Sequence, residues 1–491
     1  MGILFFGAAL YGCGPEDMTQ LDIFYTADVE GFYWTRPEPR LANRDTGGYS
    51  VLKSFLDRQR DPFLLFDGGN WFGSAPEGTM TQGAYVAQLA ATLPYSAASV
   101  SDKDFVFGWP SLRGIVRELP YPFLVSNLKL DNQIPWPLHD YHIFTKQDIK
   151  IGVFGLISPQ GMAQNKSRLS GFSVQDPVQT ARDMVALLQS KGVDVIIVLS
   201  SLGETDAAGS ADAVLAEEVP GIHLILSANK DRENAETDEI NNTYIVYPGS
   251  RLDSVVRLRL SLDKTKQLKD IQFEDIYLFK DDFGEDEDIA RHAAGLLEET
   301  RHKMNARIAQ NPREVVSALA QESELGNLLT DCLYKWSKLD GAVLNSDSIR
   351  SPLPQGVLSE YDLYKAYPYG DNITFLTIKG AAFTKALEAS LAVPDNFPQI
   401  AGFTVQYDPK APEGEKIKRI TLLNGRIVRP QETYRFAVTD HVLAGGFGHD
   451  EFINALEFKN TFVEARQIMR TCLSRKKIIE APKPGRWQVI K

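Results

Sequence analysis

The stretch Leu21-Asp22-Ile23-Phe24-Tyr25-Thr26-Ala27-Asp28-Val29-Glu30-Gly31 decides the fold of this chain of 491 residues. Its first half is mainly apolar and aromatic, which is typical of a strand buried on both faces of a sheet. Small and acidic residues follow at once, so that Asp28 and Glu30 lie just beyond the strand. Because open α/β sheets bind ligands at the carboxyl ends of their strands, these two carboxylates are the first candidates for a functional site.

The same pattern, an apolar run followed by small or polar residues, recurs up to about residue 280. Further strands are predicted at residues 63–66, 123–125, 150–154, 194–199 and 223–226, with helical patterns between them. This alternation is typical of the α/β class, in which helices flank a sheet. The last part of the chain shows an α+β pattern instead. It carries predicted helices at 322–338 and 380–391 and predicted strands at 341–344, 402–407, 417–423 and 434–438.

The length of the chain predicts two domains, because one ordinary domain has about 100 to 200 residues. We expect an N-terminal domain at residues 18–284, a charged and exposed linker helix within 285–315, and a C-terminal domain at 316–491. The balance of 52 basic and 64 acidic residues gives a net charge of −12. That charge argues against nucleic acid as a partner and against a general surface for anionic membranes, but not against a local basic pocket.

The first 17 residues have the character of a signal peptide and tether. An apolar run at 2–12 ends in Leu10-Tyr11-Gly12-Cys13, which resembles the signal of a bacterial lipoprotein with Cys13 as the lipidated residue. The run is too short to span a bilayer and lacks the basic start of a signal peptide, so a buried N-terminal strand is the alternative. The favoured interpretation predicts a lipoprotein of the bacterial periplasm or cell surface, anchored to a membrane by its lipid. Only Cys332 and Cys472 then remain, too few for a disulfide scaffold or a cysteine-rich metal site.

Acidic and amide residues at the predicted strand ends form a candidate metal site. They are Asp28, Glu30, Asn70, Asp102, Asn229 and Asp231. Oxygen ligands that converge from several loops can hold one or two cations for hydrolysis. The alternative for each residue is that it only shapes a turn or caps a helix, as Asp and Asn often do.

The spacing of these segments resembles the 5'-nucleotidase family, which includes periplasmic UDP-sugar hydrolase and 2',3'-cyclic-nucleotide phosphodiesterase. Residues 26–31 are similar to its Thr-Asn-Asp-x-His-Gly, residues 64–72 to its Leu-Leu-Asp-x-Gly-Asp segment, and residues 193–203 to its Val-Asp-x-Ile-Ile-x-Leu-Ser-His-Leu-Gly. Gly47-Gly48, residues 324–331 and residues 345–350 extend the resemblance over almost the whole chain. It implies a four-layer, calcineurin-like metallophosphoesterase sandwich of two sheets, followed by an α+β substrate-binding domain. The implied activity is hydrolysis of nucleotides with divalent metals.

The chain departs from the family at the implied metal ligands. Asp28 is kept, but Glu30 replaces a histidine, Asn70 the bridging aspartate and Asp102 an asparagine, while Ser201, Asn229 and Asp231 replace three further histidines. In the segment Asp102-Lys103-Asp104-Phe105-Val106, Lys103 stands for the catalytic histidine and Val106 for its aspartate partner. None of the seven histidines of the chain stands at a ligand position.

These replacements change the chemistry of the predicted site. Oxygen donors suit Mg²⁺, Mn²⁺ or Ca²⁺ rather than the metals that prefer imidazole, and the neutral Asn70 cannot supply an anionic bridge between two metals. Lys103 cannot donate a proton as the histidine does unless burial lowers its pKa strongly, but it can pair with Asp28 or Asp102 in place of a cation. The sequence therefore leaves the cofactor open between one divalent cation and none.

The resemblance also implies a ligand pocket in the C-terminal domain. Arg350, after Asn345 in the same loop, matches an arginine that grips the substrate phosphate. Phe397 matches one stacking aromatic and His441 stands at the second, while Phe447 replaces the aspartate that holds the ribose. Core packing is the alternative for Phe397 and Phe447, and a structural ion pair is the alternative for Arg350.

Three functions remain open from the sequence. The first is an exported protein that binds a nucleotide or another phosphorylated small molecule, with normal phosphoesterase catalysis lost or much reduced. The second is an active hydrolase that uses one oxygen-ligated cation between Asp28, Glu30, Asp102 and Asp231. The third is a structural protein of the cell envelope.

Overall fold

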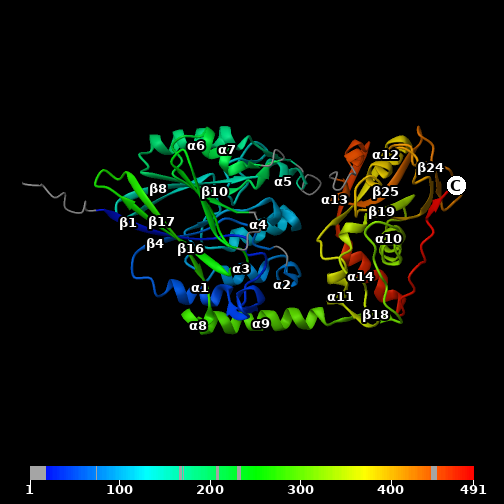
Figure 1. The fold of residues 1–491 in the computed structure, drawn as a ribbon, viewed down its shortest axis with the longest axis horizontal. Helices are drawn as coiled ribbons and strands as arrows, with labels where there is room; N and C mark the ends of the chain where they lie inside the picture. The colour runs from blue at the N-terminus through cyan, green and yellow to red at the C-terminus, as the bar shows by residue number, and fades with distance from the viewer. Residues whose placement is uncertain are drawn as a thin grey trace, which may run out of the picture.

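The computed structural model describes residues 18–72, 75–164, 169, 171–205, 209–228, 234–443 and 450–490. The strands form two groups of sheets, which lie side by side in Figure 1. Helix α9 (Glu287–Met304) runs along the base of the first group and reaches toward the second. None of the described helices is long and apolar enough to cross a membrane.

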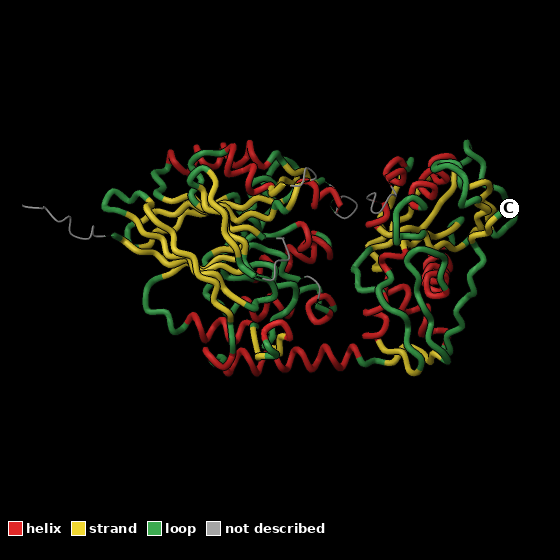
Figure 2. Tube along the Cα trace, viewed as in Figure 1, coloured by secondary structure: helices red, strands yellow, loops and turns green. Residues whose placement is uncertain are grey.

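The first group is built on two large sheets, visible as stacked yellow layers in Figure 2. One has the order β17 (Leu268–Tyr277), β16 (Ser254–Leu262), β1 (Thr19–Thr26), β4 (Phe63–Asp67) and β5 (Ala97–Ala98). The other has the order β14 (Glu236–Ile240), β15 (Thr243–Tyr247), β13 (Leu224–Ser227), β10 (Val195–Ser201), β8 (Ile149–Ile157) and β7 (Tyr141–Lys146). In the first sheet the pairs β1–β4 and β4–β5 are parallel and the pairs β17–β16 and β16–β1 are antiparallel. In the second sheet the central pairs are parallel and both edge strands are antiparallel.

Alternation along β1 explains why its residues are apolar throughout. Ile23 packs into the core between the two sheets, whereas its neighbour Phe24 packs into the core beneath the helices α1 (Gly48–Leu56) and α9. Successive side chains of a strand point to opposite faces, so both faces of this strand are buried. Helices α6 (Pro177–Ser190) and α7 (Ala211–Glu218) cover the outer face of the second sheet. The order helices, sheet, sheet, helices confirms the predicted four-layer α/β sandwich.

Most predicted strands of this part exist, with one exception. β1, β4, β8, β10 and β13 lie at the predicted positions. Residues 123–125 instead form only isolated bridges, from Phe123 to Ala98 and from Leu124 to His139. The preceding Pro122 has no backbone N–H, which limits ladder formation at this point.

The second group is built on a five-stranded sheet with helices on both faces. Its order is β22 (Pro398–Ala401), β19 (Gly341–Asn345), β25 (Thr433–Thr439), β21 (Asn372–Lys379) and β26 (Glu457–Glu464). Helices α10 (Glu324–Ser337) and α14 (Ala465–Lys476) bury one face, and α12 (Gly380–Ser390) buries the other. A small sheet of β24 (Ile417–Leu422), β23 (Phe403–Tyr407) and β27 (Trp487–Val489) extends this core, and the whole confirms the predicted α+β pattern.

A disulfide links Cys332 on α10 to Cys472 on α14 across a sequence separation of 140. Cys332 is buried in the core of the second group. Disulfides persist in oxidising compartments and are rare in reducing ones. The disulfide between these two cysteines was not predicted from the sequence.

The helix predicted within residues 285–315 is shorter and more buried than expected. Asp286 caps α9 by accepting a hydrogen bond from the backbone N–H of Ile289. Ile289, Ala293 and Leu297 recur every fourth position and are buried against the N-terminal layers, so α9 is not a fully exposed linker. It ends at Met304 because the chain then enters strand β18 (Arg307–Asn311), which pairs with β20 (Gly356–Ser359).

Candidate functional site

The loops after β1 and β4 run together at the carboxyl end of the first sheet. The backbone N–H of Asp28 donates to the carbonyl of Gly69 at 3.0 Å, and that of Glu30 donates to the carbonyl of Asn70 at 3.0 Å. Asp28, Glu30 and Asn70 all have positive φ values, of 51°, 53° and 60°. Such values are uncommon for residues other than glycine and cluster at functional sites. The fold therefore brings three of the predicted site residues together in a constrained geometry.

Asn70 points its amide at Asp28. Its Nδ2 donates to Asp28 Oδ1 at 2.7 Å, and both residues are buried, with 1% and 2% of their surface exposed. Asn70 Oδ1 is buried and has no hydrogen-bond partner in the described part of the chain. A donor therefore faces Asp28 from the position at which the resemblance implies an anionic bridge.

Asp104 holds the loop that carries Asn70. Its Oδ2 accepts hydrogen bonds from the backbone N–H groups of Asn70 and Ser101, each at 2.8 Å, and its Oδ1 accepts one from Trp71 at 2.7 Å. Burial raises the pKa of this carboxyl to about 6, although the backbone donors act in the opposite direction. Asp104 was not among the predicted site residues, although its hydrogen bonds hold the loop that carries Asn70.

Asp67, at the end of β4, supports the same loop from within the sheet. It accepts hydrogen bonds from Thr26 Oγ1 at 2.7 Å and from the backbone N–H of Gly69 at 2.8 Å. Burial raises the pKa of Asp67 well above its ordinary value. Its contacts are therefore those of a buried residue that shapes the turn.

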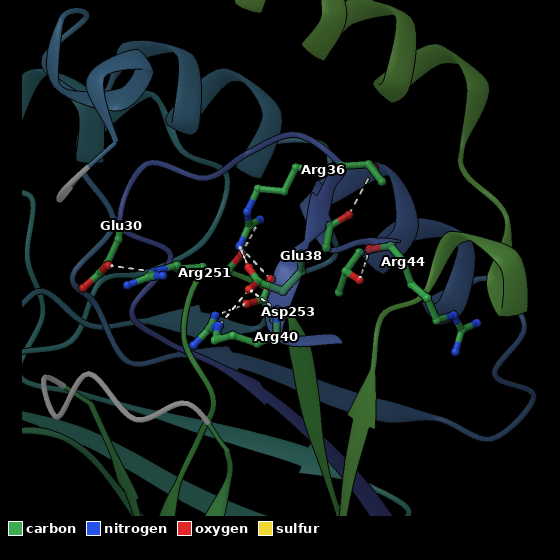
Figure 3. Close-up of polar contacts among 10 residues, drawn as sticks. Glu30, Arg36, Glu38, Arg40, Arg44, Arg251 and Asp253 are labelled. Atoms are coloured by element: carbon green, nitrogen blue, oxygen red, sulfur yellow. Dashed lines mark hydrogen bonds and ion pairs between the residues drawn. The ribbon is translucent and has the colours of Figure 1, made fainter. Parts of the chain in front are cut away.

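Arg251 is the cation that the structure places beside the acidic loop (Figure 3). Its Nε lies 3.5 Å from Glu30 Oε2, and its backbone N–H donates to the carbonyl of Asp28 at 2.7 Å. The Arg251 guanidinium also lies over the ring of Phe32, 5.5 Å from its centroid. Sequence reasoning missed Arg251 because it lies 221 positions from Glu30 and belongs to no motif.

A second group of charges anchors the segment that carries Arg251. Asp253 forms ion pairs with Arg36 Nη2 at 2.6 Å and with Arg40 Nη2 at 3.1 Å (Figure 3). Arg40 also forms an ion pair with Glu38. The Arg36 guanidinium packs over the same Phe32 ring at 4.4 Å. Burial raises the pKa of Asp253, and the charges of Arg36 and Arg40 oppose this rise. These contacts position Arg251 at the edge of the site.

Within the described part of the chain, Lys103 does not form the ion pair with Asp28 or Asp102 that the sequence left open. Its side chain is exposed at the start of the short 3₁₀ helix η2 (Asp102–Phe107), and it forms no ion pair with Asp28 or Asp102 in the described residues. The pairing is absent because Lys103 extends into solvent while Asp102 turns inward. Among the described residues, Arg251 is the cation beside Glu30.

The remaining predicted ligands are only partly described. Asp102 is buried against Gly161, where an added Cβ would lie 2.4 Å from its Cγ. Ser201 ends β10, and its buried hydroxyl has no hydrogen-bond partner among the described residues. Asn229, Asp231 and the proposed lipidation site Cys13 lie outside the described residues.

Among the described residues, the donor set does not fit the two-metal centre that the family resemblance implies. No group of three or more His, Cys, Asp or Glu side chains suited to a metal occurs in the described ranges. Asp28 shares an oxygen with an amide donor, and Glu30 lies beside a guanidinium. A pair of dications requires anionic ligands free to bridge them, which this arrangement does not supply.

The predicted ligand pocket lies at one edge of the five-stranded sheet. Asn345 ends β19 and stands opposite Pro398 in the register with β22, which places Phe397 beside it. β25 runs parallel to β19 and leads into α13 (Asp440–Leu443), which carries His441. The topology thus brings Asn345, Phe397 and His441 to one edge, while Phe447 lies outside the described residues.

Arg350 follows this edge and is already paired. Its Nη1 lies 2.9 Å from Asp347 Oδ1, and its Nε donates to the hydroxyl of Tyr369 at 2.7 Å. The side chain is 46% exposed, so an anion from solvent can reach it. Arg350 therefore forms the structural ion pair that was the alternative interpretation from the sequence, and its side chain stays accessible to solvent.

Two of the other predicted pocket residues are held by local contacts. Asn345 is fully buried and accepts a hydrogen bond from Ser348 Oγ at 2.6 Å, while its Nδ2 has no partner in the described part of the chain. Phe397 packs edge-on against Trp487 at 4.9 Å and joins the core. Phe397 thus contributes to packing as the alternative interpretation stated.

The two groups of sheets meet near both candidate sites. A Cβ added to Gly370 would lie 3.6 Å from side-chain atoms of Val106 and Phe107 on η2. Gly370 follows Tyr369, the partner of Arg350. The helix that starts with Asp102 and Lys103 therefore packs close to the loop that orients Arg350.

Comparisons with known proteins agree with this architecture. Residues 304–456 match the family described as the 5'-nucleotidase C-terminal domain. A 5'-nucleotidase of Vibrio cholerae is 24% identical over 93% of this chain and 92% of its own length. The solved structure of a putative 5'-nucleotidase from Staphylococcus aureus covers 96% of the chain with a TM-score of 0.75 and 18% identity. That of a 5'-nucleotidase precursor from Thermus thermophilus also covers 96%, with a TM-score of 0.67 and 20% identity. The C-terminal part of the chain thus matches the 5'-nucleotidase C-terminal domain, and nearly the whole chain is similar in sequence and fold to 5'-nucleotidases.

Proposed function

We propose that this protein binds a nucleotide or another phosphorylated small molecule and that two-metal phosphoester hydrolysis is lost or strongly reduced. The observation that carries the proposal is the hydrogen bond from Asn70 Nδ2 to Asp28 Oδ1 at 2.7 Å. The family and the relatives named 5'-nucleotidase support a nucleotide as the ligand.

The loss of hydrolysis follows from the charges at the strand ends. An aspartate at position 70 would add a negative charge that two metals can share, whereas the amide of Asn70 donates to Asp28. Arg251 neutralises part of the remaining negative charge at Glu30. Each contact removes electrostatic attraction for a dication from the site.

Ligand binding is assigned to the accessible guanidinium of Arg350. A guanidinium offers a planar fork of donors that suits phosphate oxygens, and the exposed side of Arg350 is not enclosed by its contacts with Asp347 and Tyr369. A phosphate competes with Asp347 for this cation, so we expect moderate affinity rather than tight binding.

The test is calorimetric titration with AMP, with matched arginine variants. Arg350→Ala is expected to weaken binding about tenfold or more, because it removes a charge-assisted contact. Arg182→Ala is the control, since Arg182 is 47% exposed and paired with Glu218 in the N-terminal layers. Absence of AMP binding in the wild type, or equal loss in both variants, would contradict the proposal.

A second candidate function rests on the unpartnered Oδ1 of Asn70. If the amide turned over, this oxygen would face Asp28, and a cation between the two would remove their repulsion. Asp28, Glu30, Asp102 and Asp231 would then hold one Mg²⁺, Mn²⁺ or Ca²⁺ in an active hydrolase. Metal analysis of the purified protein, together with thermal unfolding in each metal, decides this candidate. Absence of bound metal and of any thermal shift would reject it.

We further propose that the protein is exported and anchored by a lipid on Cys13, and that its domains comprise residues 18–284 and 316–491. The Cys332–Cys472 disulfide supports an oxidising compartment. Mass spectrometry of the mature N-terminus tests the anchor, with Cys13→Ala as the control that cannot be lipidated. An unmodified Cys13 in membrane-extracted protein would contradict it.

A further inference from the structure

A groove of 530 Å³ lies between helices α10 and α14, away from both candidate sites described above. Its lining includes Lys335 and Trp336 from α10, Arg475 and Lys476 from α14, and the Cys332–Cys472 disulfide. Its volume is in the range of pockets that bind small organic molecules. Neither the nucleotide pocket nor the strand-end site contributes a residue to it.

The disulfide determines which side chains face the groove. Lys335 and Trp336 follow Cys332 by three and four positions, and Arg475 and Lys476 follow Cys472 by the same intervals. Residues three and four apart lie on one face of a helix. The disulfide therefore holds two pairs of side chains together, each one turn beyond its cysteine. Lys335 and Trp336 lie on α10, and Arg475 and Lys476 lie on α14.

The groove is locally basic in a chain whose net charge is −12. Lys335 lies 3.7 Å from Asp331, a contact at the outer limit of an ion pair. Arg475 and Lys476 form no ion pair with any described residue. Cations in the last turn of a helix stabilise its dipole, which accounts for charge at these positions. The helix dipole does not account for an exposed aromatic ring among them.

Trp336 supplies that ring. It is 39% exposed, although tryptophan is buried in most proteins, and it packs against Phe375 with a centroid distance of 5.6 Å. An indole that packs on one side against a partly buried aromatic ring offers its remaining surface to a flat ligand. Thr471 and Gln467 add hydrogen-bonding groups to the same lining.

We propose that the groove between α10 and α14 binds a small planar organic anion, whose ring contacts Trp336 and whose negative group is held by Arg475 and Lys476. The anion is a phosphate, sulfate or carboxylate on an aromatic body. This site is independent of the proposed nucleotide pocket, and binding at one does not require the other.

Calorimetric titration of the full chain with 1-naphthyl phosphate tests the proposal. Separate titrations with 1-naphthol and with inorganic phosphate measure the binding of the aromatic part and of the anionic part of this probe. The intact probe is expected to bind more tightly than either half, because the indole and the cations act on different parts of it. Trp336→Ala and the double variant Arg475→Gln/Lys476→Gln should each weaken binding about tenfold. Lys477→Gln is the matched control, because it removes an adjacent exposed charge that does not line the groove.

The variant Arg350→Ala separates this site from the nucleotide pocket. It should leave binding of 1-naphthyl phosphate at the groove unchanged even if it abolishes binding of AMP. The proposal is overturned if the probe does not bind, if the groove variants bind it as the wild type does, or if Arg350→Ala alone removes binding. Thermal unfolding of each variant checks that the fold is intact, and the double variant changes only side chains at the surface.

Discussion

Asn70 Nδ2 donates a hydrogen bond to Asp28 Oδ1 at 2.7 Å where the buried loops that follow β1 and β4 meet. In this geometry the carboxylate of Asp28 accepts a hydrogen bond from an uncharged amide. It also leaves the other amide atom, Oδ1, without a partner in the described residues. The pair therefore distinguishes this protein physically from one in which two carboxylates share metals.

The substitution Asn70→Asp tests this relationship directly. Asp tolerates the φ of 60° as Asn does, so the change adds charge with little backbone strain. Two carboxylates in contact repel each other, and we expect a lower unfolding temperature in EDTA that Mn²⁺ or Mg²⁺ restores. Thermal unfolding with and without metal measures it. An identical response of variant and wild type to metal would contradict the expectation.

Asp104 should be a stability determinant of the site loop. Asp104→Asn replaces one acceptor oxygen by a donor that faces the backbone N–H groups of Asn70, Ser101 or Trp71. We expect a loss of about 1–3 kcal/mol in the free energy of unfolding, measured by urea denaturation. Asp131→Asn, at an exposed position, is the control and should change stability by less than about 0.5 kcal/mol.

The ion pairs of Asp22 should make part of the free energy of unfolding depend on pH. Burial acts to raise its pKa, but hydrogen bonds and charge from Arg259 and Arg257 outweigh burial and hold the pKa below 3.8. A lowered folded-state pKa contributes stability above the unfolded value, and that stability is lost as the pH falls through the folded pKa. The gap in unfolding free energy between wild type and Asp22→Asn should thus be about 1–3 kcal/mol at pH 7 and shrink below pH 3.8.

Denaturation of both proteins across the pH range measures that gap. Asp288→Asn serves as the control, since its carboxylate is 90% exposed. A gap that grows as the pH falls would refute the assignment of the ion pairs between β1 and β16.

The disulfide should stabilise the C-terminal part of the chain. Its crosslink spans 140 positions between α10 and α14, and removing a native disulfide typically costs about 2–4 kcal/mol. We expect a reductant to lower the unfolding temperature of the wild type and to leave the double variant Cys332→Ala/Cys472→Ala unchanged. Equal unfolding temperatures of reduced and oxidised wild type would contradict this.

The fold was predictable because buried strands carry a strong local signal. β1, β4, β8, β10 and β13 are apolar on both faces, and the sequence shows this without any long-range information. β16 was missed although its leucines and valines alternate with polar residues, the period of a strand. The early end of α9 depends on the pairing of β18 with β20, which local propensity does not report.

The site was predictable only where a motif carries it. Asp28, Glu30 and Asn70 were found at strand ends, and they do meet. Arg251 reaches Glu30 through the tertiary fold, and its position depends on Asp253 and the arginines around it. Lys103 was a candidate because it stands at the position of a histidine in the family motif. A position in a motif does not determine the direction of a longer side chain. The outward direction of Lys103 became visible only in the folded chain.

The central claim is tested most directly by the rate of nucleotide hydrolysis in the presence of Mn²⁺, Mg²⁺ or Ca²⁺, compared between the wild type and Asp28→Ala. If the strand-end site no longer performs two-metal chemistry, both proteins will release phosphate from AMP at the same background rate in every metal. A metal-dependent rate in the wild type that disappears in Asp28→Ala would contradict the account.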